Sequence, residues 1–129
     1  MDVLHLVGRI IFGGFFVLNG IKHFRNVERM GTWADAKGMP APRVAVVVSG
    51  IFLVLGGLSI MTGHLREFGL TLLIAFLVPV AFIMHPFWSV PKERRGEQRI
   101  QFLKNLALLG AALMLLAFLD EPWPFSLFP

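Results

Sequence analysis

The sequence predicts an all-α integral membrane protein that folds as a four-helix transmembrane bundle with a short interfacial helix. Of its 129 residues, 56% are hydrophobic and only 16% are charged, and the mean hydropathy is +0.72. Soluble domains carry roughly 25% charged residues. Four apolar runs are each long enough to cross a bilayer, which takes about 20 residues. The length allows one domain, so a single transmembrane domain is predicted over residues 1–129.

The four predicted spans stay apolar on all faces, which soluble helices of this length seldom do. They cover residues 3–21, 44–63, 68–87 and 102–119. The N-terminus has neither a basic leader nor a small-residue cleavage site, so the first run is expected to remain as a span. The connection after it, "NVERMGTWADAKGMPAP", predicts the interfacial helix over residues 27–37. Gly38 ends that helix, and two prolines then keep the chain extended before the second span.

The distribution of basic residues predicts how the bundle sits in the membrane. Nine of the twelve lie in or beside the connections between spans one and two and between spans three and four: Lys22, Arg25, Arg29, Lys37, Arg43, Lys92, Arg94, Arg95 and Arg99. Cytoplasmic connections carry such an excess of Lys and Arg, so both connections are predicted to be cytoplasmic and both termini periplasmic. Three tryptophans beside the connections are expected to be interfacial anchors: Trp33, Trp88 and Trp123.

Several function classes are excluded by what the chain lacks. It contains no cysteine, so it has no disulfide, thiolate metal site or thiol nucleophile. It also lacks zinc-ligand spacing, a catalytic triad, paired carboxylates and phosphate-binding loops, so no catalytic or metal site is predicted. The net charge of +4 falls between apolar runs rather than on one solvated face, which argues against nucleic-acid binding. The expected partners are the lipid bilayer and either another protein or a second copy of this chain.

One stripe of the first span carries most of its polar and aromatic side chains. The stripe consists of His5, Arg9, Phe12, Phe16, Asn19 and His23, at spacings of four, three, four, three and four. Arg9 lies about two turns inside the outer boundary, and no apolar run holds a carboxylate to neutralise it. It is therefore expected to reach outward to an acidic partner at the rim or to serve a ligand.

Three spans bring polar groups to one depth near the cytoplasmic boundary. Asn19, His85, Lys104 and Asn105 are predicted to lie within about one helical turn of the same level. Lys104 can extend to the interface, but an amide that faces lipid would leave its hydrogen bonds unmade. Two interpretations of "IMHPFW" around His85 stay open. It is either a helix end at the interface or part of a polar floor beneath a cavity walled by Phe12, Phe16 and Phe82.

The order of these features resembles the DoxX family over nearly the whole chain. The resemblance is carried by "GRIIFGGFFVLNGIKHF", "KGMPAP", "SGIFLVLGGLSIMTG", "HPFW" and "QFLKNLALLGAAL". It implies a four-helix protein of the bacterial cytoplasmic (inner) membrane. It also implies two roles: a membrane subunit or partner of oxidoreductases, including thiosulfate:quinone oxidoreduction, and association with redox-stress enzymes. In one respect the chain departs from the family, because Leu53 stands where many relatives carry a glutamate.

Two functions therefore remain from the sequence. In the first, the chain is a non-enzymatic accessory or scaffold subunit of a membrane-associated redox or stress-related complex. In the second, it is a quinone- or lipid-binding membrane subunit of an oxidoreductase, with quinone as its cofactor. Pairs of glycines seven residues apart form small-residue seams that allow close helix contacts: Gly13 and Gly20, Gly50 and Gly57, and Gly56 and Gly63. These seams and the lack of redox residues favour the first function, and the polar groups at one depth favour the second.

Overall fold

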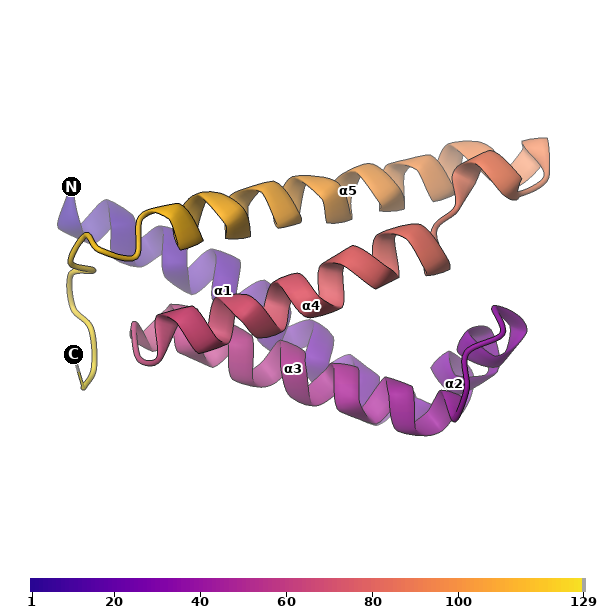
Figure 1. The fold of residues 1–129 in the computed structure, drawn as a ribbon, viewed down its shortest axis with the longest axis horizontal. Helices are drawn as coiled ribbons and strands as arrows, with labels where there is room; N and C mark the ends of the chain where they lie inside the picture. The colour runs from indigo at the N-terminus through magenta and orange to yellow at the C-terminus, as the bar shows by residue number, and fades with distance from the viewer. Residues whose placement is uncertain (129) are drawn as a thin grey trace.

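The fold is all-helical, as predicted. A computed structural model describes residues 1–128 and shows five α-helices and one 3-10 helix (Figure 1). They are α1 (Asp2–Arg25), α2 (Val27–Ala36), α3 (Pro42–Thr62), α4 (Arg66–Met84), η1 (Phe87–Ser89) and α5 (Lys92–Ala117). Within the described residues, four helical segments are long and apolar enough to cross a membrane: α1, α3, α4 with η1, and α5. The short helix α2 matches the predicted interfacial helix.

The helix α5 is longer than predicted, because it begins at Lys92 rather than at residue 102. The basic residues expected in a loop instead form its first turns. Lysine, arginine, glutamate and glutamine are good helix formers, and Glu93 in the first turn complements the positive helix N-terminus. An apolar run marks only the part of a helix that lies in lipid, so it cannot reveal a polar extension.

Both chain termini lie at one end of the bundle, and α2 lies at the other (Figure 1). We call these the terminal end and the basic end, since the second carries Arg29 of α2 and the basic residues at the start of α5. Along the bundle, α1 packs on α3, α3 on α4, and α4 on α5, while α2 packs on α3. The closest neighbours among the four spans are thus consecutive in the chain, and α1 and α5 meet mainly through side chains.

Glycines set the close packing of α1 on α3. A Cβ atom added to Gly57 would lie 2.5 Å from the backbone oxygen of Gly13, and one added to Gly20 would lie 2.8 Å from that of Gly50. Real Cβ atoms do not approach other atoms so closely, so the two backbones touch directly at both levels. Small residues allow such approaches in membranes, where dispersion contacts drive helix association.

Alanine at Gly57 is expected to destabilise the bundle. Its methyl group would push α1 away from α3, and overpacking of this kind costs about 1–3 kcal/mol. The matched control is Gly14→Ala, because a Cβ at Gly14 meets nothing within 4 Å and alanine is the better helix former. Thermal unfolding in mild detergent should show a lower midpoint for Gly57→Ala and an unchanged or higher one for Gly14→Ala. Equal midpoints would contradict the direct backbone contact.

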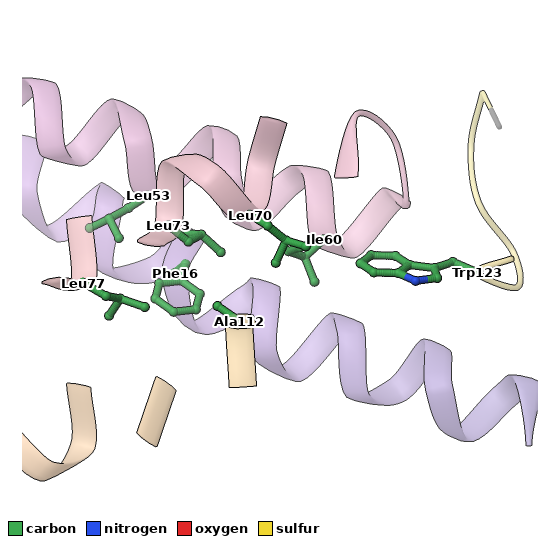
Figure 2. Close-up of a cluster of buried hydrophobic side chains, with 8 residues drawn as sticks. All are labelled: Phe16, Leu53, Ile60, Leu70, Leu73, Leu77, Ala112 and Trp123. Atoms are coloured by element: carbon green, nitrogen blue, oxygen red, sulfur yellow. The ribbon is translucent and has the colours of Figure 1, made fainter. Parts of the chain in front are cut away.

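The apolar core lies between the four spanning helices (Figure 2). It contains Phe16, Leu53, Ile60, Leu70, Leu73, Leu77, Ala112 and Trp123. Phe16 and Ala112 bring side chains of α1 and α5 into one cluster, although the backbones of these helices are not close neighbours. The core therefore joins the four spans and extends from mid-depth to Trp123 at the terminal end.

Trp123 differs from the predicted interfacial anchor, because its side chain is only 6% exposed. Its ring lies edge-on to His5, at 5.6 Å between ring centroids, and under the guanidinium groups of Arg9 and Arg66. It fills the terminal end of the bundle, because the chain after α5 folds back over that end. Trp33 and Trp88, by contrast, are about half exposed at the basic end, where an interfacial anchor would lie.

Candidate ligand-binding site

A cavity of about 440 Å³ lies in the half of the bundle nearer the basic end. Volumes of roughly 300–1,000 Å³ are usual for sites that hold small molecules. Side chains from α1, α3, α4 and α5 line it, and α2 with the turn that follows contributes Met30, Trp33, Ala34 and Met39. The short helix therefore covers the cavity from the basic end.

Five of the eight predicted site residues line this one cavity: Phe16, Asn19, His85, Lys104 and Asn105. They lie together because three helices bring these side chains to one depth in the bundle. Most of the remaining wall is apolar and includes Phe15, Phe52, Phe76 and Val80. The cavity thus joins an apolar body to a small polar region, as amphipathic ligands require.

Asn105 is the most informative residue of the polar region. Its side chain is only 6% exposed and lines the cavity. Among the described residues its amide has no hydrogen-bond partner, and its polar atoms are not sealed inside the protein either. Buried amides are normally hydrogen-bonded, so this amide presents a free donor and a free acceptor to whatever fills the cavity.

His23 belongs to the same region, although it was not among the predicted site residues. It is 9% exposed, lines the cavity and packs edge-on to Phe76. Its Nδ1 lies 2.7 Å from the backbone oxygen of Asn19. Membership of the polar stripe of the first span was the signal that could have identified it. The predicted span ended at residue 21, which placed His23 outside the membrane and outside the candidate set.

His85 ends α4 and is held by a residue of α5. Its Nδ1 lies 3.0 Å from Oε1 of Gln98, and Gln98 is itself buried. The sequence did not point to Gln98, because the segment that contains it was expected to be a loop. The contact fixes the imidazole at the basic end of the cavity rather than in the lipid.

Asn19 and Lys104 have local partners as well as a place on the cavity wall. The amide of Asn19 donates to the backbone oxygen of Phe15 at 2.8 Å. The ammonium of Lys104 donates to Oε1 of Gln101 at 2.9 Å and lies over the ring of Phe15. Lys104 is exposed, so it marks the rim of the cavity on α5.

The other three predicted site residues lie elsewhere. Phe82, expected in the cavity wall, is 50% exposed and packs against Trp88 and Phe102 in an aromatic cluster that joins α4 and η1 to α5. Phe12 and Arg9 line a second cavity at the terminal end, between α1, α5 and Trp123. The predicted stripe of α1 is thus divided between two cavities by Phe16 and the core.

Arg9 is 3% exposed and bonds to backbone carbonyls rather than to the acidic partner expected at the rim. Its Nε and Nη2 donate to the oxygens of Ile60 and Met61, each at 3.1 Å. Its guanidinium also donates to the backbone oxygens of Pro124 and Phe125. The last carbonyls of a helix lack intrahelical donors, so Arg9 caps α3 and ties the C-terminal segment to it.

Leu53 is fully buried and lines the cavity near the basic end. Arg9 contacts α3 at Ile60, about 10 Å further along the helix axis. A carboxylate at position 53 would therefore face the cavity rather than Arg9. With leucine there, no aspartate or glutamate lines the cavity within the described residues.

Comparison with known proteins agrees with this architecture. A family model described as DoxX matches residues 4–86, which run from α1 to the end of α4. The chain is 26% identical over 113 residues to the inner membrane protein YphA of Escherichia coli strain K12, an alignment covering 88% of this chain and 81% of that relative. No solved structure matches the chain. With its four membrane-spanning helices, the chain is a multi-pass inner-membrane protein and belongs to the DoxX family.

Proposed function

We propose that this protein is a non-enzymatic membrane subunit that holds an amphipathic, lipid-soluble molecule in the cavity at its basic end. The free amide of Asn105, buried in an apolar cavity, is the observation that carries the proposal. Its amide reaches the cavity but bonds to no described residue, so a ligand head there would find both a hydrogen-bond donor and an acceptor.

A quinone or a lipid is the class of ligand that fits this site. Phe52, Phe76 and Val80 would contact the apolar part, while Asn105, His23 and His85 would hold the polar head. A quinone supplies electron transfer when bound, and the chain's own residues would bind and orient it. No carboxylate lines the cavity within residues 1–128, so these residues include no acidic proton carrier. The role that fits is that of an accessory subunit which presents its ligand to a partner oxidoreductase.

The proposal can be tested by filling the cavity with a larger side chain and measuring how much lipid or quinone the purified protein retains. Ala45 lines the cavity, so Ala45→Phe should exclude most of the bound lipid or quinone. The matched control is Ala117→Phe, at an exposed position of α5 that lines neither cavity, which should keep it. Bound molecules would be extracted from mild-detergent preparations and quantified by mass spectrometry against protein. Equal retention by the two variants would show that the bound molecules lie outside the cavity.

A scaffold role has its own support in α5. This helix is the least covered of the four spans, with 11% of its most apolar 18 residues buried, and its closest neighbours are α4 and η1. A Cβ added to Gly110 meets nothing within 4 Å, so Gly110 and the exposed Ala107 offer a small-residue surface. Such surfaces allow close helix contacts in membranes. We infer that a helix of a partner protein or of a second copy packs here, which Gly110→Leu should weaken in cross-linking of whole membranes.

We further propose that the basic end faces the cytoplasm and that both termini face the periplasm, since the basic end carries nine of the twelve Lys and Arg residues. The chain has no cysteine, so single-cysteine variants report orientation directly. Exposed Glu67 and Lys37 lie at opposite ends. In intact cells a membrane-impermeant maleimide should label Glu67→Cys and leave Lys37→Cys unlabelled until the cells are opened. The reverse pattern would invert the proposed orientation.

A further inference from the structure

The two histidines of the cavity show which hydrogen bonds a ligand must supply. The Nδ1 atom of His23 lies 2.7 Å from a backbone carbonyl oxygen, and a carbonyl oxygen only accepts hydrogen bonds. Nδ1 therefore carries the proton. A neutral imidazole has one N–H, so its Nε2 is left as an acceptor. Nε2 of His23 has no partner among the described residues.

His85 has the same arrangement. Its Nδ1 faces Oε1 of Gln98 at 3.0 Å, and an amide oxygen is likewise an acceptor, so its Nε2 also accepts. No aspartate or glutamate lines the cavity within the described residues, so an imidazolium there would have no counter-ion. The polar region thus contains two imidazole acceptors beside the amide of Asn105.

The charged groups around the cavity also limit which head group a ligand can have. Without a carboxylate in the cavity, nothing there would balance a cationic head such as an amine. The ammonium of Lys104 at the rim would repel it. A head that only accepts hydrogen bonds, such as the carbonyl of an oxidised quinone, would pair with Asn105 but leave both Nε2 atoms unpaired. A hydroxyl can donate to Nε2 and accept from the amide of Asn105.

We propose that the cavity selects a neutral amphipathic molecule whose head donates at least one hydrogen bond, such as a phenol, a quinol or a lipid alcohol. The inference rests on the proposed function, because it specifies the ligand of the same cavity. The acceptor atoms are Nε2 of His23 and Nε2 of His85.

The test uses 4-nonylphenol and 4-nonylanisole as probes. The two have the same ring and tail, but O-methylation removes the donor and leaves the acceptor. Binding would be measured with protein in lipid nanodiscs and corrected with empty nanodiscs. The phenol should bind about tenfold more tightly, because the anisole leaves a buried acceptor unpaired. His23→Phe and His85→Phe should each reduce this preference, whereas Phe82→Leu, outside the cavity, should keep it.

The outcomes distinguish failure of the donor requirement from failure of the proposed function. Equal binding of both probes, abolished by Ala45→Phe, would overturn the donor requirement and leave the proposed function standing. Absence of binding by either probe would overturn both. His23→Phe is expected to fold, because the backbone oxygen of Asn19 still accepts the helical bond from the N–H of residue 23. A preference that survives in both histidine variants would also overturn the inference.

Discussion

Replacement of Arg9 by leucine is expected to lower the free energy of unfolding by about 3 kcal/mol. A buried ion pair can often be replaced by apolar residues at little cost. Arg9 is different, because its partners are backbone carbonyls that remain after the substitution. The oxygens of Ile60 and Met61 would then be buried without donors. Unfolding in increasing SDS, followed by circular dichroism, would measure the loss.

The lysine variant separates charge from geometry. Arg9→Lys keeps the positive charge near the negative C-terminal end of α3, but a single ammonium cannot reach carbonyls on both α3 and the C-terminal segment. The free energy of unfolding of Arg9→Lys should therefore fall, but by less than that of Arg9→Leu. A leucine variant as stable as the unmodified protein would show that Arg9 does not cap α3.

Replacement of Asn105 by leucine is expected to separate binding from stability. The leucine would remove the unpaired amide from an apolar environment, so the fold should be unchanged or more stable. Ligand binding should fall at least about tenfold, because the head group loses its bond to the amide. Asn26→Leu is a suitable control, since Asn26 lies between α1 and α2 outside the cavity and bonds only locally. A leucine variant that both unfolds readily and keeps its ligand would show that Asn105 is structural.

The fold followed from the sequence because lipid makes apolar length a direct measure of a span. The stripe of the first span could also be predicted from the spacing of its residues. Its members Arg9, Phe16 and His23 are buried, while Ile11 and Leu18 on the opposite face are exposed. The seams at Gly13 and Gly57 follow from the same periodicity. These features depend on helix geometry, which the order of residues specifies.

The other features of the site depend on contacts between distant parts of the chain, which no local sequence pattern predicts. The partners of Arg9 are backbone carbonyls, which every residue possesses, so no pattern could identify Ile60 or Pro124. Trp123 was expected at the interface because it follows the last span, but the fold-back of the C-terminal segment buries it. Gln98 was missed because the start of α5 is polar although helical. Asn105 was predicted correctly because an amide so deep in a span would leave its hydrogen bonds unmade if it faced lipid.

Photolabelling with a 4-nonylphenol analogue that carries a diazirine in its tail tests directly whether the cavity holds a ligand. In proteoliposomes we expect saturable labelling of cavity residues such as Phe52 and Phe76. An excess of unlabelled 4-nonylphenol should block it, and Ala45→Phe should abolish it. Labelling confined to outward-facing residues such as Ile11 and Leu18, and unaffected by competitor, would contradict the claim that this cavity holds a ligand.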